Sequence, residues 1–183
     1  MKHALICFAF TLTSSFASAT ILHYQGRGTV ASTSGSSICR VYVKKNDAGE
    51  ILAARIDGYY LKNDAKVEWD TVSLRFIDPE KQGAPLESCD LGGRSCIDSR
   101  QNKMTVQRTF GYSHVGVSHR RQEFVELQLK GDGTLLRASV NLRKSERQLL
   151  IPYRSTETIE CNNLKLLGEI TRPDVVYTLE NAR

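Results

Sequence analysis

Apolar and polar residues alternate with a period of two along most of this chain. The alternation runs through residues 38–46, 51–60, 72–76, 124–130 and 135–142. Its apolar positions are Cys39, Val41, Val43, Leu52, Ala54, Ile56, Val72, Leu74, Phe76, Val125, Leu127, Leu129, Leu136, Ala138, Val140 and Leu142. Because successive side chains of a strand point to opposite faces, this pattern predicts antiparallel strands with one buried and one solvated face.

Turn-forming residues separate these runs. The segments 45–50 (KNDAGE) and 130–134 (KGDGT) are rich in Gly, Asp and Asn and predict hairpins. Further strands are expected at 21–33, 157–167 and 174–179, and a short helix at 143–150 (RKSERQLL). Gly26 and Gly28 in the first strand mark a bend of the kind found in barrels. The prediction is an all-β fold of about eight to ten strands, either an antiparallel β-sandwich or a small β-barrel.

The first nineteen residues have the pattern of a secretory signal peptide. Lys2 precedes an apolar run, and Ala17 and Ala19 occupy the small-residue positions before a cleavage site. The run is too short to span a bilayer, and no later segment is long and apolar enough to do so. The sequence therefore predicts cleavage after Ala19 and one exported domain, periplasmic or secreted, over residues 20–183.

Cysteine usage agrees with export. Without Cys7, which lies in the leader, four cysteines remain, and an oxidising compartment would pair them as two disulfides. Cys89 and Cys96 flank a Gly-Gly turn, so the two are predicted to bond, which leaves Cys39 for Cys161. A spacing of seven residues suits neither a zinc site nor a redox pair. The polar stretch near 78–102 is thus expected to be a surface loop stapled by a disulfide.

The formal net charge of +5 is modest for the length of the chain. It argues against nucleic acid as a partner and allows one basic patch. The densest cationic stretch supplies the candidate ligand-binding residues Arg108, Tyr112, His114, His119, Arg120 and Arg121. Arginine forks suit carboxylate and phosphate groups, and the tyrosine adds stacking surface. The alternative is an ordinary solvated loop.

Motifs for catalysis are weak. The segment 111–116 resembles a nucleophile elbow, but its second glycine comes one residue too late. On one strand His114 and His119 would face opposite sides, which disfavours a shared metal. Glu68 and Asp70 form a carboxylate pair that is more typical of a strand edge. No phosphate-binding or dinucleotide motif is present. No catalytic residue, metal site or cofactor is predicted.

Together these patterns indicate an exported, disulfide-stabilised, non-catalytic binding module. Its partner is expected to be an anionic or amphipathic ligand, a glycan or another protein. The alternative is an interaction or inhibitor protein that uses the loop 86–98, and a hydrolase is less favoured. The sequence leaves the oligomeric state open.

Overall fold

The computed structural model describes most of the chain after the leader. The described residues are 19–30, 37–63, 65–68, 72–76, 84–91, 95–100, 102–114, 117–148 and 151–181. They form one sheet of eleven strands and one short helix, so the predicted all-β class is confirmed, with one more strand than the expected range. The predicted signal peptide and Asp70 lie outside the described residues.

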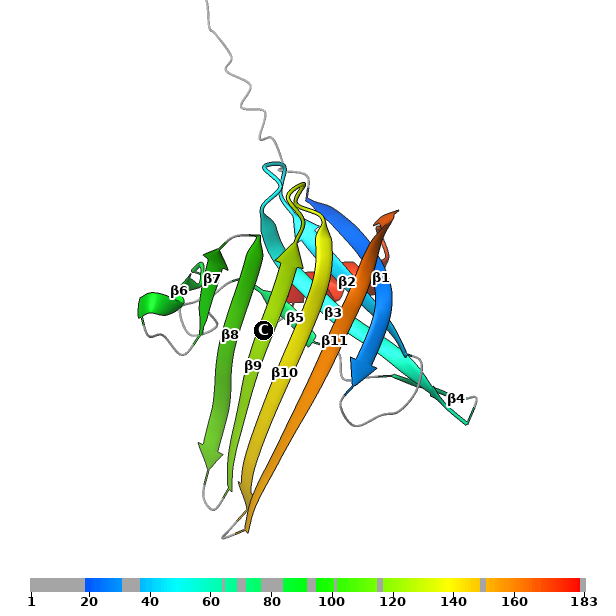
Figure 1. Cartoon of the computed structure of the whole chain (residues 1–183). Helices are drawn as coiled ribbons and strands as arrows, with labels where there is room; N and C mark the ends of the chain where they lie inside the picture. The colour runs from blue at the N-terminus through cyan, green and yellow to red at the C-terminus, as the bar shows by residue number, and fades with distance from the viewer. Residues whose placement is uncertain are drawn as a thin grey trace, which may run out of the picture.

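The strands form a single, almost entirely antiparallel sheet (Figure 1). They are β1 (Thr20–Val30), β2 (Ser37–Lys45), β3 (Ile51–Lys62), β4 (Ala65–Glu68), β5 (Val72–Arg75), β6 (Glu87–Ser88), β7 (Cys96–Arg100), β8 (Lys103–His114), β9 (Val117–Leu129), β10 (Leu135–Gln148) and β11 (Ile151–Glu169). Their order is β4-β3-β2-β1-β11-β10-β9-β8-β7-β6, and β5 pairs with β3. The short pair β6 and β7 is parallel.

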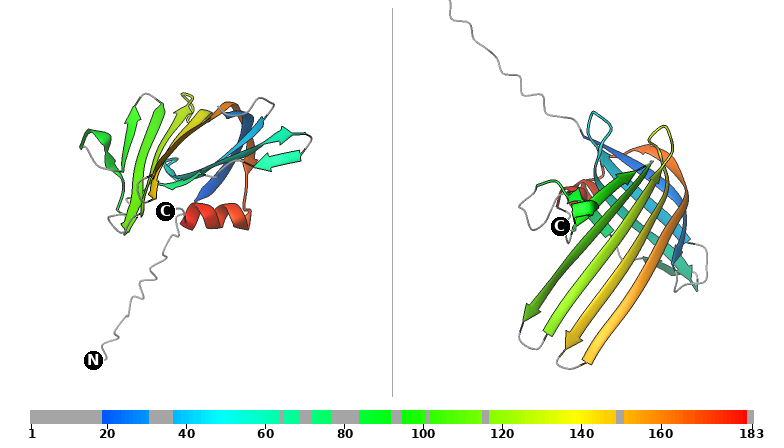
Figure 2. Two further views of the ribbon diagram at one scale, coloured as in Figure 1. Left: turned by 90° about the horizontal axis from the view of Figure 1, so that it is seen from below. Right: turned by 60° about the vertical axis from the view of Figure 1, so that its left-hand side comes forward.

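The sheet curls so strongly that its two halves face each other (Figure 2). One half contains β1, β2, β3 and β5, and the other contains β8 to β11. The core between them consists of Tyr24, Cys39, Val41, Val43, Ala54, Ile56, Val72, Leu74, Val125, Leu127, Leu135, Ala138, Val140, Leu142, Ile159, Cys161 and Leu164. Most of these are the alternating positions of the sequence, and the architecture is a barrel left open between β5 and β8.

A corner of the sheet lies at Gly26 in β1, where the pairing with β11 is irregular. The pairing of β1 with β11 shifts register between Gln25 and Arg27, and a Cβ on Gly26 would lie 2.4 Å from the backbone oxygen of Asn162. Only glycine tolerates so close an approach. The corner brings β2 and β11, the two neighbours of β1, within reach of one disulfide.

Both predicted disulfides are present. Cys39 of β2 bonds Cys161 of β11 across the corner, with 5.6 Å between their Cα atoms. Cys89 bonds Cys96 around the short 3-10 helix η1 (Cys89–Leu91), with Cα atoms 4.8 Å apart. The described part of the stapled loop also contains β6 and β7, so it forms an edge of the sheet as well as a surface loop.

The expected strand at 174–179 is wrong, because these residues belong to helix α1 (Pro173–Asn181). Its valines favour a strand by composition, but Val175 and Leu179 lie four residues apart, as one helical face requires. Both are buried against Ile21, Tyr42 and Ala53 on the outer face of the sheet. Proline at the first helical position and Asp174 after it start the helix.

The helix expected at 143–150 is also wrong, because residues 143–148 continue strand β10. They pair with β9 on one side and with β11 on the other. Within β10 the register shifts between Leu135 and Arg137, which makes Leu135 the buried residue while Leu136 is 37% exposed. A bulge of this kind changes which residues face inward and is not visible in a two-residue period.

Candidate functional site

Strands β8 to β11 continue well beyond the core. We call their outer part the projection and define it as residues 109–114, 117–122, 143–148 and 151–156. The partner β7 ends its pairing at Gln107, and β1 ends its pairing at Ile159. The projection is therefore a four-stranded sheet that extends past the rest of the molecule (Figures 1 and 2). A small sheet with both faces in solvent lacks the burial that usually stabilises one.

Residues paired across neighbouring strands share a face of the sheet, so the strand registers define two surfaces. The outer face, opposite the core, places Gly111, Arg120, Ser145 and Arg154 in one row across β8, β9, β10 and β11. Arg143 lies two residues before Ser145 in β10, and Arg147 lies two residues after it. Four arginines thus surround Ser145. We call Arg120, Arg143, Arg147 and Arg154 the arginine face.

The dimensions of the arginine face follow from sheet geometry. With strands about 4.8 Å apart, Arg120 and Arg154 are separated by roughly 10 Å, and Arg143 and Arg147 by roughly 13 Å along β10. All four side chains are exposed. A shallow depression of about 310 Å³ lies among Arg120, Arg143, Arg154 and their neighbours Gln122, Lys144, Ser145, Ser155 and Thr156.

No described carboxylate forms an ion pair with these four guanidinium groups. Arg143 contacts only neutral partners, with Nε donating to Asn141 Oδ1 at 3.3 Å and the guanidinium 5.2 Å from the Phe124 ring. By contrast Arg137, on the same face of the same strand nearer the core, is paired with Glu160 at 3.0 Å. Positive charge on the outer face is therefore compensated near the core and uncompensated on the projection.

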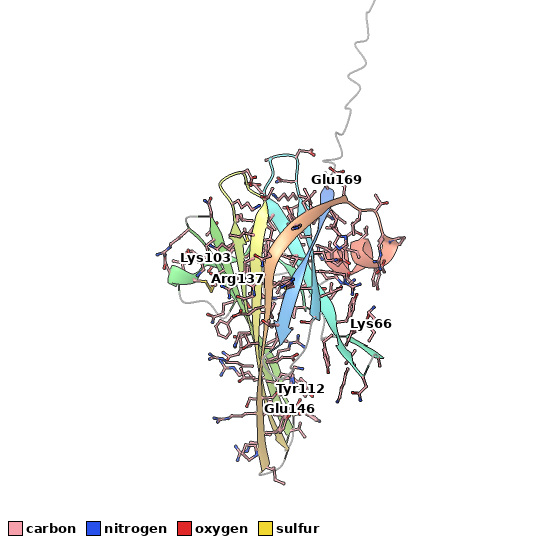
Figure 3. All side chains as sticks on the ribbon, turned by 45° about the vertical axis from the view of Figure 1, so that its right-hand side comes forward. Lys66, Lys103, Tyr112, Arg137, Glu146 and Glu169 are labelled. Atoms are coloured by element: carbon pink, nitrogen blue, oxygen red, sulfur yellow. A yellow bond between two sulfur atoms is a disulfide. The ribbon has the colours of Figure 1, made fainter. Side chains whose placement is uncertain are left out.

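The inner face of the projection is different. Tyr112, His119, Glu146 and Tyr153 form one row across the four strands. The Tyr112 ring stacks on His119 with centroids 5.5 Å apart, and His119 Nε2 lies 3.4 Å from Glu146 Oε1. Tyr112 is 64% exposed and Tyr153 62%. Figure 3 shows Tyr112 and Glu146 at the far end of the sheet from Arg137. This face is aromatic, and its charges are mixed.

The transition from core to projection is a buried charged layer. Arg108 of β8 faces Glu123 of β9 on the inner side, and both are buried. Arg108 Nη1 donates to the backbone oxygen of Ser73 at 3.5 Å, across the opening between β8 and β5. Arg121 Nε lies 2.8 Å from Glu123 Oε1. Burial lowers the pKa of Arg108, whereas the charge of Glu123 raises it.

The structure distributes the six sequence-predicted site residues over different places. Arg120 alone lies on the arginine face. Arg108 is buried at the opening, and Arg121 is paired with Glu123 on the inner side. The other three lie on the inner face, because the antiparallel register of β8 and β9 puts His114 and His119 on the same side. The predicted cluster is therefore split between two surfaces.

Sequence reasoning missed Arg143, Arg147 and Arg154. Their signal was present as Arg-x-Ser-x-Arg at 143–147, which places both arginines on one face of a strand. Assigning this segment to a helix concealed it. Matching Arg120 to Arg154 also needs the registers between β9, β10 and β11, which single-strand patterns do not contain.

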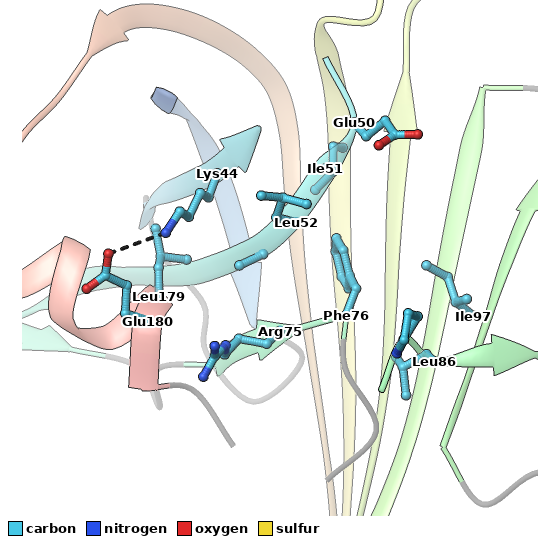
Figure 4. Close-up of a pocket in the computed structure, with 12 residues that line it drawn as sticks. Lys44, Glu50, Ile51, Leu52, Arg75, Phe76, Leu86, Ile97, Leu179 and Glu180 are labelled. Atoms are coloured by element: carbon cyan, nitrogen blue, oxygen red, sulfur yellow. Dashed lines mark hydrogen bonds and ion pairs between the residues drawn. The ribbon is translucent and has the colours of Figure 1, made fainter. Parts of the chain in front are cut away.

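A separate pocket of about 580 Å³ lies between β3, the region near Phe76 and helix α1 (Figure 4). Its apolar lining includes Ile51, Phe76, Leu86 and Ile97. The volume is in the range of small-molecule sites. Two cations and two carboxylates line it, and Lys44 is already paired with Glu180 at 3.3 Å. The pocket suits an apolar group better than a charged one.

Other chemistry finds little support in the described part of the chain. Ser113 and His114 are neighbours in β8, so their side chains point to opposite faces. Among the described residues no group of three His, Cys, Asp or Glu side chains is placed to hold a metal ion. Nor does the described portion contain a helix with the length and apolar character needed to cross a membrane.

Comparison of the chain with protein-family models, with curated proteins and with solved structures gives no match.

Proposed function

We propose that this protein is an exported, non-catalytic binding module that holds an anionic ligand on the arginine face. The observation that carries the proposal is the set of four exposed arginines without a described carboxylate partner. These positive charges lie within roughly 10–13 Å of one another, and no described carboxylate compensates them. An anion that binds between them would supply the missing negative charge.

The shape of this surface favours an extended ligand over a compact one. The arginine face is nearly flat, and its charges are spread over roughly 10–13 Å. A polymer that carries carboxylate or sulfate groups, such as an acidic polysaccharide, can contact several guanidinium groups at once. Ser145 and Gln122 add hydrogen-bonding groups between the arginines. Both disulfides agree with a protein that works in an oxidising compartment.

The test compares two arginines of one strand. Binding of a sulfated polysaccharide (heparin) and of a carboxylated one (polygalacturonate) is measured by titration calorimetry at about 0.15 M salt and at lower salt. We expect Arg147→Ala to weaken binding about tenfold, because a charge-assisted hydrogen bond is lost. The matched control is Arg137→Ala, which removes the same charge from the same face of β10 but leaves the arginine face intact.

The outcomes separate clearly. Weakened binding in Arg147→Ala with near wild-type binding in Arg137→Ala supports the proposal. An equal loss in both variants would mean that binding depends on net charge and not on the arginine face. Absence of binding by the wild-type protein at low salt would refute the function outright. Preference for one polymer identifies the anionic group.

A further inference from the structure

The edge of β8 along the projection is free in the described structure. Its neighbour β7 pairs with β8 only over Lys103–Gln107. From Gly111 to His114 the strand is exposed, and no described strand pairs with it on that side. Figure 1 shows the lower part of β8 as the outermost strand. An unpaired edge is a template for another strand.

The position of Pro152 in β11 shows, through the strand registers, which backbone groups of β8 point away from the sheet. Proline has no N–H, so its pair with Arg147 must be one of the non-hydrogen-bonded pairs of the β10–β11 ladder. The N–H and C=O of one strand residue point to the same neighbouring strand. A residue that forms no backbone hydrogen bonds with one neighbour therefore forms them with the other, and the two kinds of pair alternate along a row. The row of Pro152 continues through Arg147 and Ser118 to Ser113. The backbone groups of Ser113 therefore point away from β9, as do those of Thr109 and Gly111.

The two edges of the projection are not equivalent. On the β11 edge, Pro152 removes an outward donor and Arg154 adds a charge, which are two common ways of blocking strand addition. Residues 109–114 of β8 contain neither proline nor lysine, and Gly111 leaves the middle of this edge without a side chain. Strand addition is thus favoured on β8.

We propose that two copies of this protein associate by antiparallel pairing of their β8 strands about a two-fold axis at Gly111. In this register Thr109 of one copy lies opposite Ser113 of the other, and Phe110 lies opposite Tyr112. The outward groups of Thr109, Gly111 and Ser113 then meet their own counterparts and can form about six backbone hydrogen bonds.

The side chains fit this register on both faces. On the inner face, each Phe110 meets a Tyr112, and aromatic pairs across strands are stabilising. On the outer face, Thr109 meets Ser113, another favourable pair, and the two Gly111 residues leave the axis unobstructed. No arginine of the arginine face lies opposite another arginine across the axis. The pairing would create one continuous eight-stranded sheet with both arginine faces on the same side.

This inference does not depend on an anionic ligand, because the pairing uses only the protein's own backbone and side chains. The mass of the full mature protein is measured by light scattering and sedimentation velocity at micromolar concentration without ligand. The wild-type protein is expected to be a dimer. Ser113→Pro removes one outward donor without affecting the ladder to β9, so it is expected to be a monomer with unchanged circular dichroism.

Thr156→Pro is the matched control. Thr156 lies in β11 at the same outward phase as Pro152, so the change is chemically identical but affects the opposite edge. It is expected to remain a dimer. A monomeric wild-type protein would overturn the inference, and so would a dimer that survives Ser113→Pro.

A second variant guards against misfolding of the proline variants. In the double variant Thr109→Cys, Ser113→Cys the new cysteines of one chain lie four residues apart along a strand, too far apart for a bond within the chain. Across the axis they are directly opposed. Mild oxidation is expected to give a covalent dimer from the double variant and much less from either single variant. Equal cross-linking by all three would contradict the register.

Discussion

The same four strands behave differently in their two halves. Near the core, the inner positions of β8 to β11 are aliphatic, as in Val125, Leu127 and Val140, and pack against the other half of the sheet. On the projection the same alternating phase carries Tyr112, His119, Glu146 and Tyr153, and nothing in the described structure covers them. The part of each strand near the core builds the fold, and the part in the projection presents its side chains to solvent.

The buried layer formed by Arg108 and Glu123 lies at the boundary between the core part and the projecting part of these strands. A buried arginine is costly unless its hydrogen bonds are satisfied, and Arg108 Nε and Nη2 have no partner in the described structure. Such a layer contributes little to stability. Strands β8 and β9 continue past this layer, whereas the buried apolar residues of the described core do not.

The largest effect is expected from the disulfide of the corner. Replacing Cys39 and Cys161 together by alanine opens a loop of 122 residues and should lower the free energy of unfolding by about 5 kcal/mol in the chain-entropy model. The same change at Cys89 and Cys96 opens a loop of seven residues and should cost about half as much. Urea unfolding measures both. Equal losses would show that loop length does not govern the stabilisation.

A smaller difference in stability is expected between single substitutions in the core and on the projection. Leu127→Ala removes a fully buried side chain and should cost about 2–5 kcal/mol through the cavity it leaves. Tyr153→Ala removes an exposed aromatic side chain on the projection and should change the stability by no more than about 0.5 kcal/mol. Denaturant titration of the two variants checks this. A large cost for Tyr153→Ala would mean that the projection is buried in the native assembly.

The smallest effect is expected from pH. Burial, and then the positive charge of Arg40, lower the pKa of His23, which stacks on Tyr42 with ring centroids 4.7 Å apart. The unfolded chain therefore binds the proton more readily, so this contribution is present above the ordinary pKa of 6.5 and is lost as pH falls below it. His23→Phe should keep the stacking and reduce the loss of stability between about pH 7.5 and pH 5.

His114→Phe is the control for this measurement, because His114 is exposed on the projection. It should remain acid-sensitive, because it leaves His23 and its stacking on Tyr42 in place. If the two variants behave alike, the acid sensitivity does not originate at His23.

Much of the core was visible in the sequence because period-two alternation reports burial directly. The positions 41, 43, 54, 56, 125, 127, 138, 140 and 142 were all predicted inward and are all buried. Both disulfides followed from cysteine count and spacing. Tyr42 lies between the inward positions 41 and 43 and so falls on the face predicted to be solvated, but helix α1 covers it. The sequence of one strand cannot reveal what packs on its outer side.

The arginine face was missed for a related reason. Its members come from three strands, and only the registers of β9, β10 and β11 bring them together. The stretch 108–121 is rich in cationic residues, but consecutive side chains of a strand point to opposite faces of the sheet. Charged residues that are consecutive along a strand are therefore divided between its two faces. Predicting a site on one face also requires knowing which residues of the neighbouring strands are paired with them.

The pairing of β1 with β11 has a consequence for biogenesis. Synthesis from the N-terminus delivers β1 early and β11 much later. Until β11 arrives, β1 has only one neighbour, Cys39 lacks its native partner, and the apolar strip under helix α1 is uncovered. Completion of the fold must wait for β11, so folding helpers have a defined interval in which to protect the unpaired edge of β1.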